Sequence, residues 1–155
     1  MQRAYSSFAS SITVALATNA FTDQHNVIYN PAAVLSRPSL YDVLIGSSAV
    51  PADTAVQWGI YRTATAPTGG TAVTASPLDP NDPAASTLAQ SKPTGGSTLG
   101  VMLMWLALNQ RATFRWCAVP GGELVVGAAV GAGIGLVSVL AATPAVMETT
   151  LFFRE

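Results

Sequence analysis

The side chains that could carry chemistry are few and stand far apart along the chain. His25 is the only histidine and Cys117 the only cysteine. A serine nucleophile needs a histidine base with a carboxylate behind it, and no serine lies in the G-x-S-x-G turn of hydrolases. The polar run 23–26 (DQHN) predicts a solvated loop histidine, whereas the alternating sequence around Cys117 is typical of a small buried hydrophobic residue. We therefore expect no catalytic residues and no enzyme activity.

The carboxylates Asp79 and Asp82 lie close together in the run 77–83 (PLDPNDP). Glycoside hydrolases use such a pair as acid and base, and calcium loops use several oxygen ligands in dense alternation. The run lacks the D-x-D-x-D-G pattern, and its prolines favour turns. We expect these carboxylates to cap turns, with Asp82 as the N-cap of a short helix that begins at Pro83. No metal site is predicted, since zinc also needs several His or Cys ligands.

Cofactor motifs are missing from the sequence. Gly131, Gly133 and Gly135 resemble a dinucleotide fingerprint, but the third glycine falls one position early and no βαβ unit surrounds it. Lys92, the only lysine, lacks the preceding glycines of a phosphate-binding loop. We expect no cofactor.

The composition limits the partners of this chain. Only 10% of its 155 residues are charged, against about 25% in ordinary soluble domains, and the net charge is −1. This excludes a nucleic-acid binder that works by neutralising phosphates. With 50% hydrophobic residues, the surface must consist of small residues or be covered by other protein. We expect a homo-oligomer or a larger assembly, because obligate interfaces are poor in charge.

Residues 124–147 form an uncharged stretch that is long enough to cross a bilayer. No Lys or Arg flanks it closely, and its glycines and Pro144 disfavour a helix. It divides into a short strand, a Gly/Ala loop and a second strand from Gly135. We expect no membrane span, and a small membrane protein remains the less favoured alternative.

The elements that must position these residues are strands, because hydrophobic residues recur with period two. Together with the nearly continuous apolar runs at 40–45 and 99–108, the expected strands occupy residues 11–18, 26–29, 56–65, 112–119, 124–126, 135–140 and 146–154. The pattern predicts an all-β fold, an antiparallel β-sandwich and specifically a jelly roll, as one domain over 1–155. Residues 1–10 are expected to form an N-terminal arm. Residues 66–98 are expected to form a long Gly/Pro/Thr-rich connection with the short helix at 83–90, and a connection of this length is usually functional.

Aromatic side chains occur at strand spacing, which is typical of core or subunit-contact residues rather than of a sugar-binding platform. The expected contacts with partner chains come from the strands, the arm and the long connection. They are Tyr5, Phe8, Trp58, Tyr61, Leu78, Asp79, Asp82 and Trp105.

The second half of the chain resembles a known class of virion protein. Residues 114–124 (FRWCAVPGGEL) precede a Gly-rich loop, a strand at 135–141 and a last strand at 148–155. This order is similar to the closing strands of jelly-roll decoration, or cement, proteins of tailed-phage capsids. Residues 56–65 (VQWGIYRTAT) and the Thr/Gly/Pro-rich run to Pro83 are similar to strand-and-loop patterns in such proteins.

The resemblance implies a homotrimer on the outer capsid surface of a virion, where it bridges subunits of the major capsid protein. It implies no catalytic residues. The segments before Ser11 and over 66–98 would order against the shell on binding. Two alternatives stay open: another virion component of the neck, tail or glycan-binding receptor module, and the membrane protein mentioned above.

Overall fold

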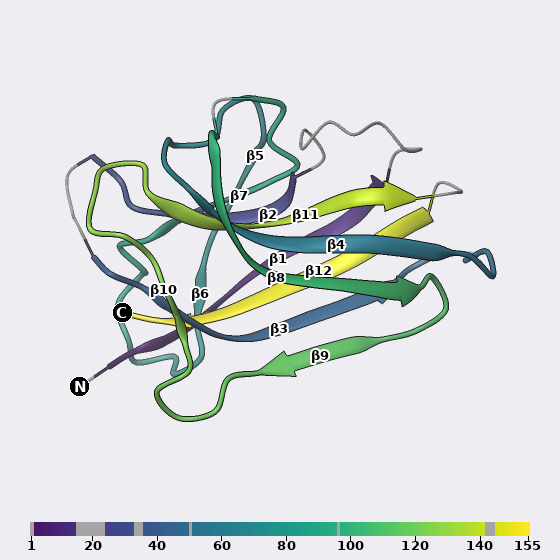
Figure 1. Cartoon of the computed structure of the whole chain (residues 1–155). Coiled ribbons are helices and arrows are strands. Elements are labelled where there is room, and N and C mark those ends of the chain that lie inside the picture. Colours follow the sequence, from purple (N-terminus) through teal and green to yellow (C-terminus); the bar gives the residue numbers. More distant parts are fainter. Residues whose placement is uncertain (1, 15–23, 33–35, 50, 96, 142–144) are drawn as a thin grey trace.

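The computed structural model describes residues 2–14, 24–32, 36–49, 51–95, 97–141 and 145–155. In this part of the chain, two antiparallel sheets pack face to face (Figure 1). The strands are β1 (Ala4–Val14), β2 (Gln24–Tyr29), β3 (Ser39–Ser47), β4 (Ala55–Thr63), β5 (Thr71–Val73), β6 (Ser76–Pro77), β7 (Leu88–Ser91), β8 (Leu99–Asn109), β9 (Phe114–Cys117), β10 (Leu124–Val125), β11 (Gly133–Ala141) and β12 (Ala145–Arg154).

Four nested pairings define the fold. β1 pairs with β12, β2 with β11, β3 with β9 and β4 with β8, all antiparallel. The chain thus forms one long double-stranded ribbon that rolls up when β12 pairs with β3 and β11 with β4. The resulting orders, β1-β12-β3-β9 and β2-β11-β4-β8, are those of a jelly roll. The predicted antiparallel β-sandwich is confirmed, and its connectivity is that of the predicted jelly roll.

Alternating side chains build the core between the sheets. In β12, every second residue from Ala145 to Phe153 is buried and the residues between are half-buried. Trp58 of β4 is completely buried and is the largest of the fully buried side chains. Each large apolar side chain of this kind stabilises the fold by roughly 1.5–3 kcal/mol through its removal from water. The period-two pattern in the sequence is therefore the pattern of core contacts.

The helix predicted over 83–90 is absent, and that prediction is wrong. Residues 88–91 form β7, which pairs with β2 on one side and β5 on the other. Further upstream, the backbone N–H groups of Ser86 and Thr87 donate to the carboxylate of Glu155. Distant partners therefore accept the backbone N–H hydrogen bonds that a helix would have made internally. The N-cap residue Asp82 is not enough to start a helix here.

The N-terminal arm predicted over 1–10 is also wrong for most of its length. From Ala4 onward the chain is in β1, which lies between β12 and β6 within a sheet. Tyr5, Ser7 and Ala9 are buried, whereas Phe8 is exposed. The strand thus begins well before the residue at which the hydrophobic run begins, because a serine occupies one of the inward positions.

The uncharged stretch at 124–147 contains strands where the alternative required a helix. β10, β11 and the start of β12 lie in it. Among the residues that the structure describes, no helix has the length and apolar character needed to cross a bilayer.

His25 was predicted to be a solvated loop residue, and this is wrong. It is the extra residue of a bulge in β2, because Asn26 pairs with Leu136 and Gln24 with the adjacent Val137. The bulge turns the ring into the interior, where Nε2 lies 2.9 Å from Oγ of Ser138 and the ring packs against Trp58. Burial lowers the pKa of His25 to about 3, with a smaller contribution from the charge of Lys92.

This histidine makes stability depend on pH. The folded protein keeps His25 neutral down to about pH 3, whereas the unfolded chain takes up its proton near pH 6.5. Stability is therefore complete above pH 6.5 and falls as the pH is lowered, by roughly 1 kcal/mol for each pH unit. Guanidinium unfolding at pH 7, 6 and 5 measures this slope. Asp42 and Glu155 also have lowered pKa values in the folded protein. Their protonation reduces the stability of the fold further only below about pH 4.

The matched variant is His25→Gln, which keeps a polar side chain next to Ser138 but does not titrate. Its stability is expected to stay nearly constant between pH 7 and 5, since His25 is the only histidine of the chain. An equal slope in the variant and the wild type would show that another group is responsible.

Candidate interaction surfaces

Three of the eight residues predicted to contact partner chains lie in the core. They are Tyr5, Trp58 and Tyr61, which are all almost completely buried. Tyr5 stacks on Phe153 with ring centroids 5.6 Å apart, and its hydroxyl donates to the carbonyl of Pro83. These side chains hold the sandwich together and are not available to a partner.

The other five reach the surface but do not form one site. Leu78, Asp79 and Asp82 lie on the loop that follows β6, Phe8 lies on β1, and Trp105 lies on β8. β1 and β8 belong to different sheets, and β1 contacts β2, β5 and β7, which lie at the other side of the second sheet from β8. The structure therefore contains several separate surfaces, which we consider in turn.

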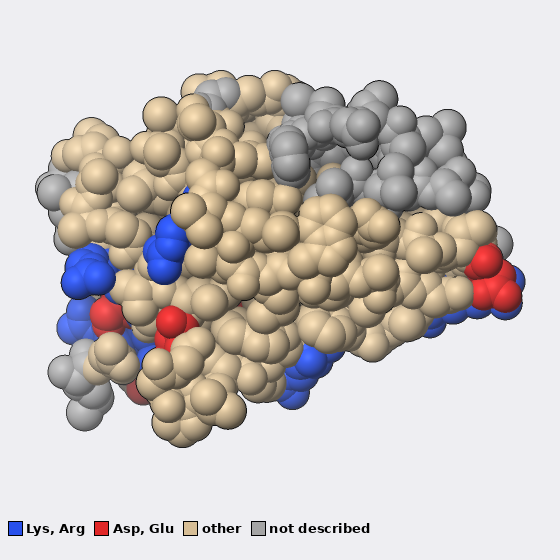
Figure 2. Space-filling model, in the orientation of Figure 1, with Lys and Arg blue, Asp and Glu red and all other residues tan. Residues whose placement is uncertain are grey.

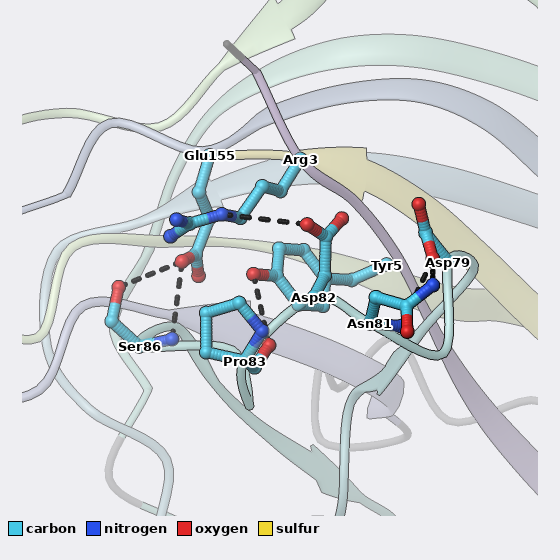
Figure 3. Close-up of polar contacts among 8 residues, drawn as sticks. All are labelled: Arg3, Tyr5, Asp79, Asn81, Asp82, Pro83, Ser86 and Glu155. Atoms are coloured by element: carbon cyan, nitrogen blue, oxygen red, sulfur yellow. Dashed lines mark hydrogen bonds and ion pairs between the residues drawn. The ribbon is translucent and has the colours of Figure 1, made fainter.

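The loop after β6 is tied to both ends of the described chain (Figure 3). Oδ1 of Asp79 accepts hydrogen bonds from the backbone N–H and the side-chain amide of Asn81, which confirms its predicted role in a turn. Asp82 lies 3.5 Å from Nε of Arg3, in an ion pair. Among the described residues, no group of three or more His, Cys, Asp or Glu side chains could hold a metal ion.

Glu155 is the centre of this arrangement. Its Oε2 accepts hydrogen bonds from the N–H (3.1 Å) and the hydroxyl (2.8 Å) of Ser86, and its Oε1 accepts one from the N–H of Thr87 at 2.5 Å. Burial alone raises the pKa of Glu155, but the bonds from Thr87 and Ser86 outweigh it and hold the pKa below its ordinary value. The loop is thus a fixed structural element, and Asp79 and Asp82 serve its geometry.

The edge of the second sheet is the most unusual surface of the molecule. β8 pairs with β4 on one side, and the other side has no neighbouring strand in the described chain. Its eleven residues include no charged side chain. Val101, Met102 and Trp105 are 68%, 46% and 45% exposed. With the half-buried Leu103, Met104, Leu106 and Leu108, which pack at the margin of the core, they form what we call the β8 edge surface.

Three of the other edge strands in the described sheets are protected in ways that natural proteins use. β5 and β6 are three and two residues long, and β6 contains Pro77. β9 has four residues, and its Arg115 forms an ion pair with Asp42 of β3, with Nη2 and Oδ2 2.5 Å apart. Hydrogen bonds from Arg115 hold the pKa of Asp42 below its ordinary value. β8 is long and uncharged, and only its two bulges interrupt the edge.

Figure 2 shows the same contrast on the surface of the molecule. The surface along β8 shows no Lys, Arg, Asp or Glu atoms, and the charged atoms lie at its margins. A contiguous apolar area at a sheet edge marks a site of contact with protein or an aggregation hazard.

The two residues singled out for nucleophilic chemistry are not arranged for it. His25 is completely buried, and its Nδ1 has no hydrogen-bond partner among the described residues, so no carboxylate orients the ring. Cys117 is exposed on β9 next to Asp42, so the prediction that it is buried is wrong. The carboxylate beside it, Asp42, is already bound by Arg115.

Comparison of the chain with protein-family models, with curated proteins and with solved structures finds no match. The argument for function consequently depends on the surfaces described above.

The hydrogen bonds from Ser86 and Thr87 to Glu155, which we call the Glu155 clamp, give a testable prediction. Replacing Glu155 by Gln removes one acceptor oxygen and places an amide donor against a backbone N–H group. We expect a loss of about 1 kcal/mol in stability and several-fold faster hydrogen exchange at the Ser86 and Thr87 amides. Glu123→Gln is the control, because its exposed ion pair with Arg154, at 3.9 Å, contributes little. Unchanged exchange at both amides would contradict the role of the clamp.

Proposed function

We propose that the protein is a structural virion protein, a decoration or cement protein of a tailed-phage capsid. It forms a homotrimer through the β8 edge surface, binds the outer surface of the shell and bridges subunits of the major capsid protein. The observation that carries this proposal is β8, a long edge strand that is apolar on both faces and uncharged. The jelly-roll connectivity supports it, because this is the fold that the resemblance of residues 114–155 implies.

The chemistry of β8 favours another copy of this chain as the partner. Around a symmetry axis, the same residue of each copy lies near its equivalents, so a charged residue there would be repelled by its own kind. β8 has no such residue over its whole length. Its exposed Trp105 and Met102 are of the types enriched at interface centres. Three copies can therefore bury this surface against one another without electrostatic cost.

A trimer also suits the role of a cement. Each copy contributes the same small capsid-binding surface, and three weak contacts in one particle add up through avidity. The chain is a rigid sandwich with few charges, so it has no means of long-range electrostatic attraction to the shell. Binding is expected to depend on the number of simultaneous contacts.

The oligomer is tested by light scattering after size-exclusion chromatography. We expect the wild type to have three times the chain mass of 15.9 kDa. The double variant Met102→Glu/Trp105→Glu places like charges at the axis and is expected to be a monomer with an unchanged β-sheet circular dichroism spectrum. Val119→Glu is the control, since Val119 is 72% exposed but lies on a turn outside β8. A monomeric wild type would contradict the proposed trimer.

The location is tested on virus particles. Mass spectrometry and immunogold labelling of purified particles are expected to find many copies on the shell, and shells without the protein should open at lower temperature. The monomeric double variant should bind shells at least tenfold more weakly, because avidity is lost. Labelling confined to the neck or tail would favour the alternative virion role, and absence from particles would overturn the proposal.

A further inference from the structure

A second surface lies on the opposite edge of the sandwich from β8. There, β1 of one sheet faces β5 and β7 of the other, and a groove of about 530 Å³ lies between them. This volume is within the range of small-molecule sites in proteins. Its lining residues include Phe8, Lys92 and five Ser and Thr residues, among them Ser10, Thr71 and Ser91. No carboxylate is among the lining residues.

Lys92 is in an unusual backbone conformation. Its φ of 47° makes it the only non-glycine residue with a positive φ in the described part of the chain. Glycine or asparagine adopts this conformation at lower cost, and here it is held by a hydrogen bond from the Lys92 N–H to the carbonyl of His25. The only lysine of the chain thus occupies a position where a lysine is disfavoured. A function of the side chain accounts for this placement.

Among the described residues, the charge of Lys92 has no ion-pair partner. No ion pair joins its ammonium group to a described residue, whereas Arg3, Arg115 and Arg154 each have one. The side chain is exposed at the groove, beside hydroxyl groups that can both donate and accept hydrogen bonds. The groove is therefore suited to a ligand that has an anionic group and several hydroxyl groups.

Phe8 supplies the apolar part of the site. It is 57% exposed in the middle of β1, opposite Thr150 of β12, and no strand of the described chain covers it. An exposed aromatic ring beside hydroxyl groups fits a sugar ring, which presents C–H groups on its face and hydroxyl groups at its rim. A peptide has no such ring of hydroxyl groups, and a nucleotide base that stacks on Phe8 carries its hydroxyl groups on a separate sugar ring.

We propose that this groove binds an acidic saccharide, a sugar that carries a carboxylate. The sugar ring stacks on Phe8, its hydroxyl groups bond to the Ser and Thr residues, and its carboxylate pairs with Lys92. The site is independent of the proposed trimer, because it lies at the edge of the sandwich away from β8.

The probe is a tetrasaccharide of alternating glucuronic acid and N-acetylglucosamine, and the neutral N-acetylglucosamine tetramer is the matched control. Calorimetry and NMR shift mapping are expected to show binding of the acidic probe, with changes centred on Phe8 and Lys92. The neutral tetramer should bind roughly tenfold more weakly or not at all, since it lacks the charge-assisted bond.

Variants separate the contributions of Lys92 and Phe8. Lys92→Gln is expected to reduce affinity for the acidic probe at least tenfold, Lys92→Arg to retain it, and Phe8→Ala to reduce affinity for both saccharides. Lys92→Gly should raise the melting temperature by relieving the backbone while abolishing preference for the acidic probe. Arg111→Gln, in the turn between β8 and β9, is the control and should bind like the wild type.

Three results would overturn the inference: no binding of this probe or of a sialylated trisaccharide, equal affinity for acidic and neutral probes, or unchanged binding by Lys92→Gln. The mass of every groove variant by light scattering is expected to equal that of the wild type. Failure of saccharide binding with an intact trimer would therefore leave the proposed assembly role standing, and the reverse also holds.

Discussion

The antiparallel pairing of β1 with β12 is the constraint on which the rest of the structure depends. It joins the first and last strands of the chain along most of their length, with backbone bonds between Arg3 and Glu155 continuing it at one end. Once these strands are paired, the nested order of the ribbon follows, and the middle of the chain must form the far end of the roll. β8 and β9 come from that middle and become the outermost strands of their sheets on one side. The most exposed edges are thus a consequence of connectivity.

The chain treats its two sides differently. On the side of β1 and β2, the long connection between β4 and β8 returns to both sheets: β7 pairs with β2, and β6 pairs with Tyr5 and Ser6 at the start of β1. Glu155 and Tyr5 fix this connection by binding the backbone of residues 83–87. On the other side, the described chain adds no such strand to β8. This difference between the two sides supports the proposed contact at the β8 edge surface.

The sequence predicts the sandwich well because alternate side chains of a strand point to the same face. The residues of the period-two pattern are therefore the ones that contact the core. β12 and β4 could be placed from their hydrophobic residues alone. The failures occur where a distant partner decides the structure. The predicted helix at 83–90 does not form, because Ser86 donates to Glu155, nearly seventy positions away, and residues 88–91 pair with β2. His25 lies in a polar run but is turned inward by a bulge, and no local signal marks it. Tyr5 and Tyr61 could not be told from contact residues, because aromatic spacing is the same in a core and at an interface.

The same connection that protects one edge also creates the groove. β5 and β7 extend the second sheet beyond β2, and the polar residues of the connection, including Thr71 and Ser91, face the exposed part of β1 across the gap. A plain jelly roll of eight strands would have an open edge here and no concavity. The insertion that removes an aggregation hazard therefore also assembles hydroxyl groups, an aromatic ring and the only lysine around one hollow. A long connection of this kind is where function is expected in a β-sandwich, because the strands that carry it are held fixed by the core.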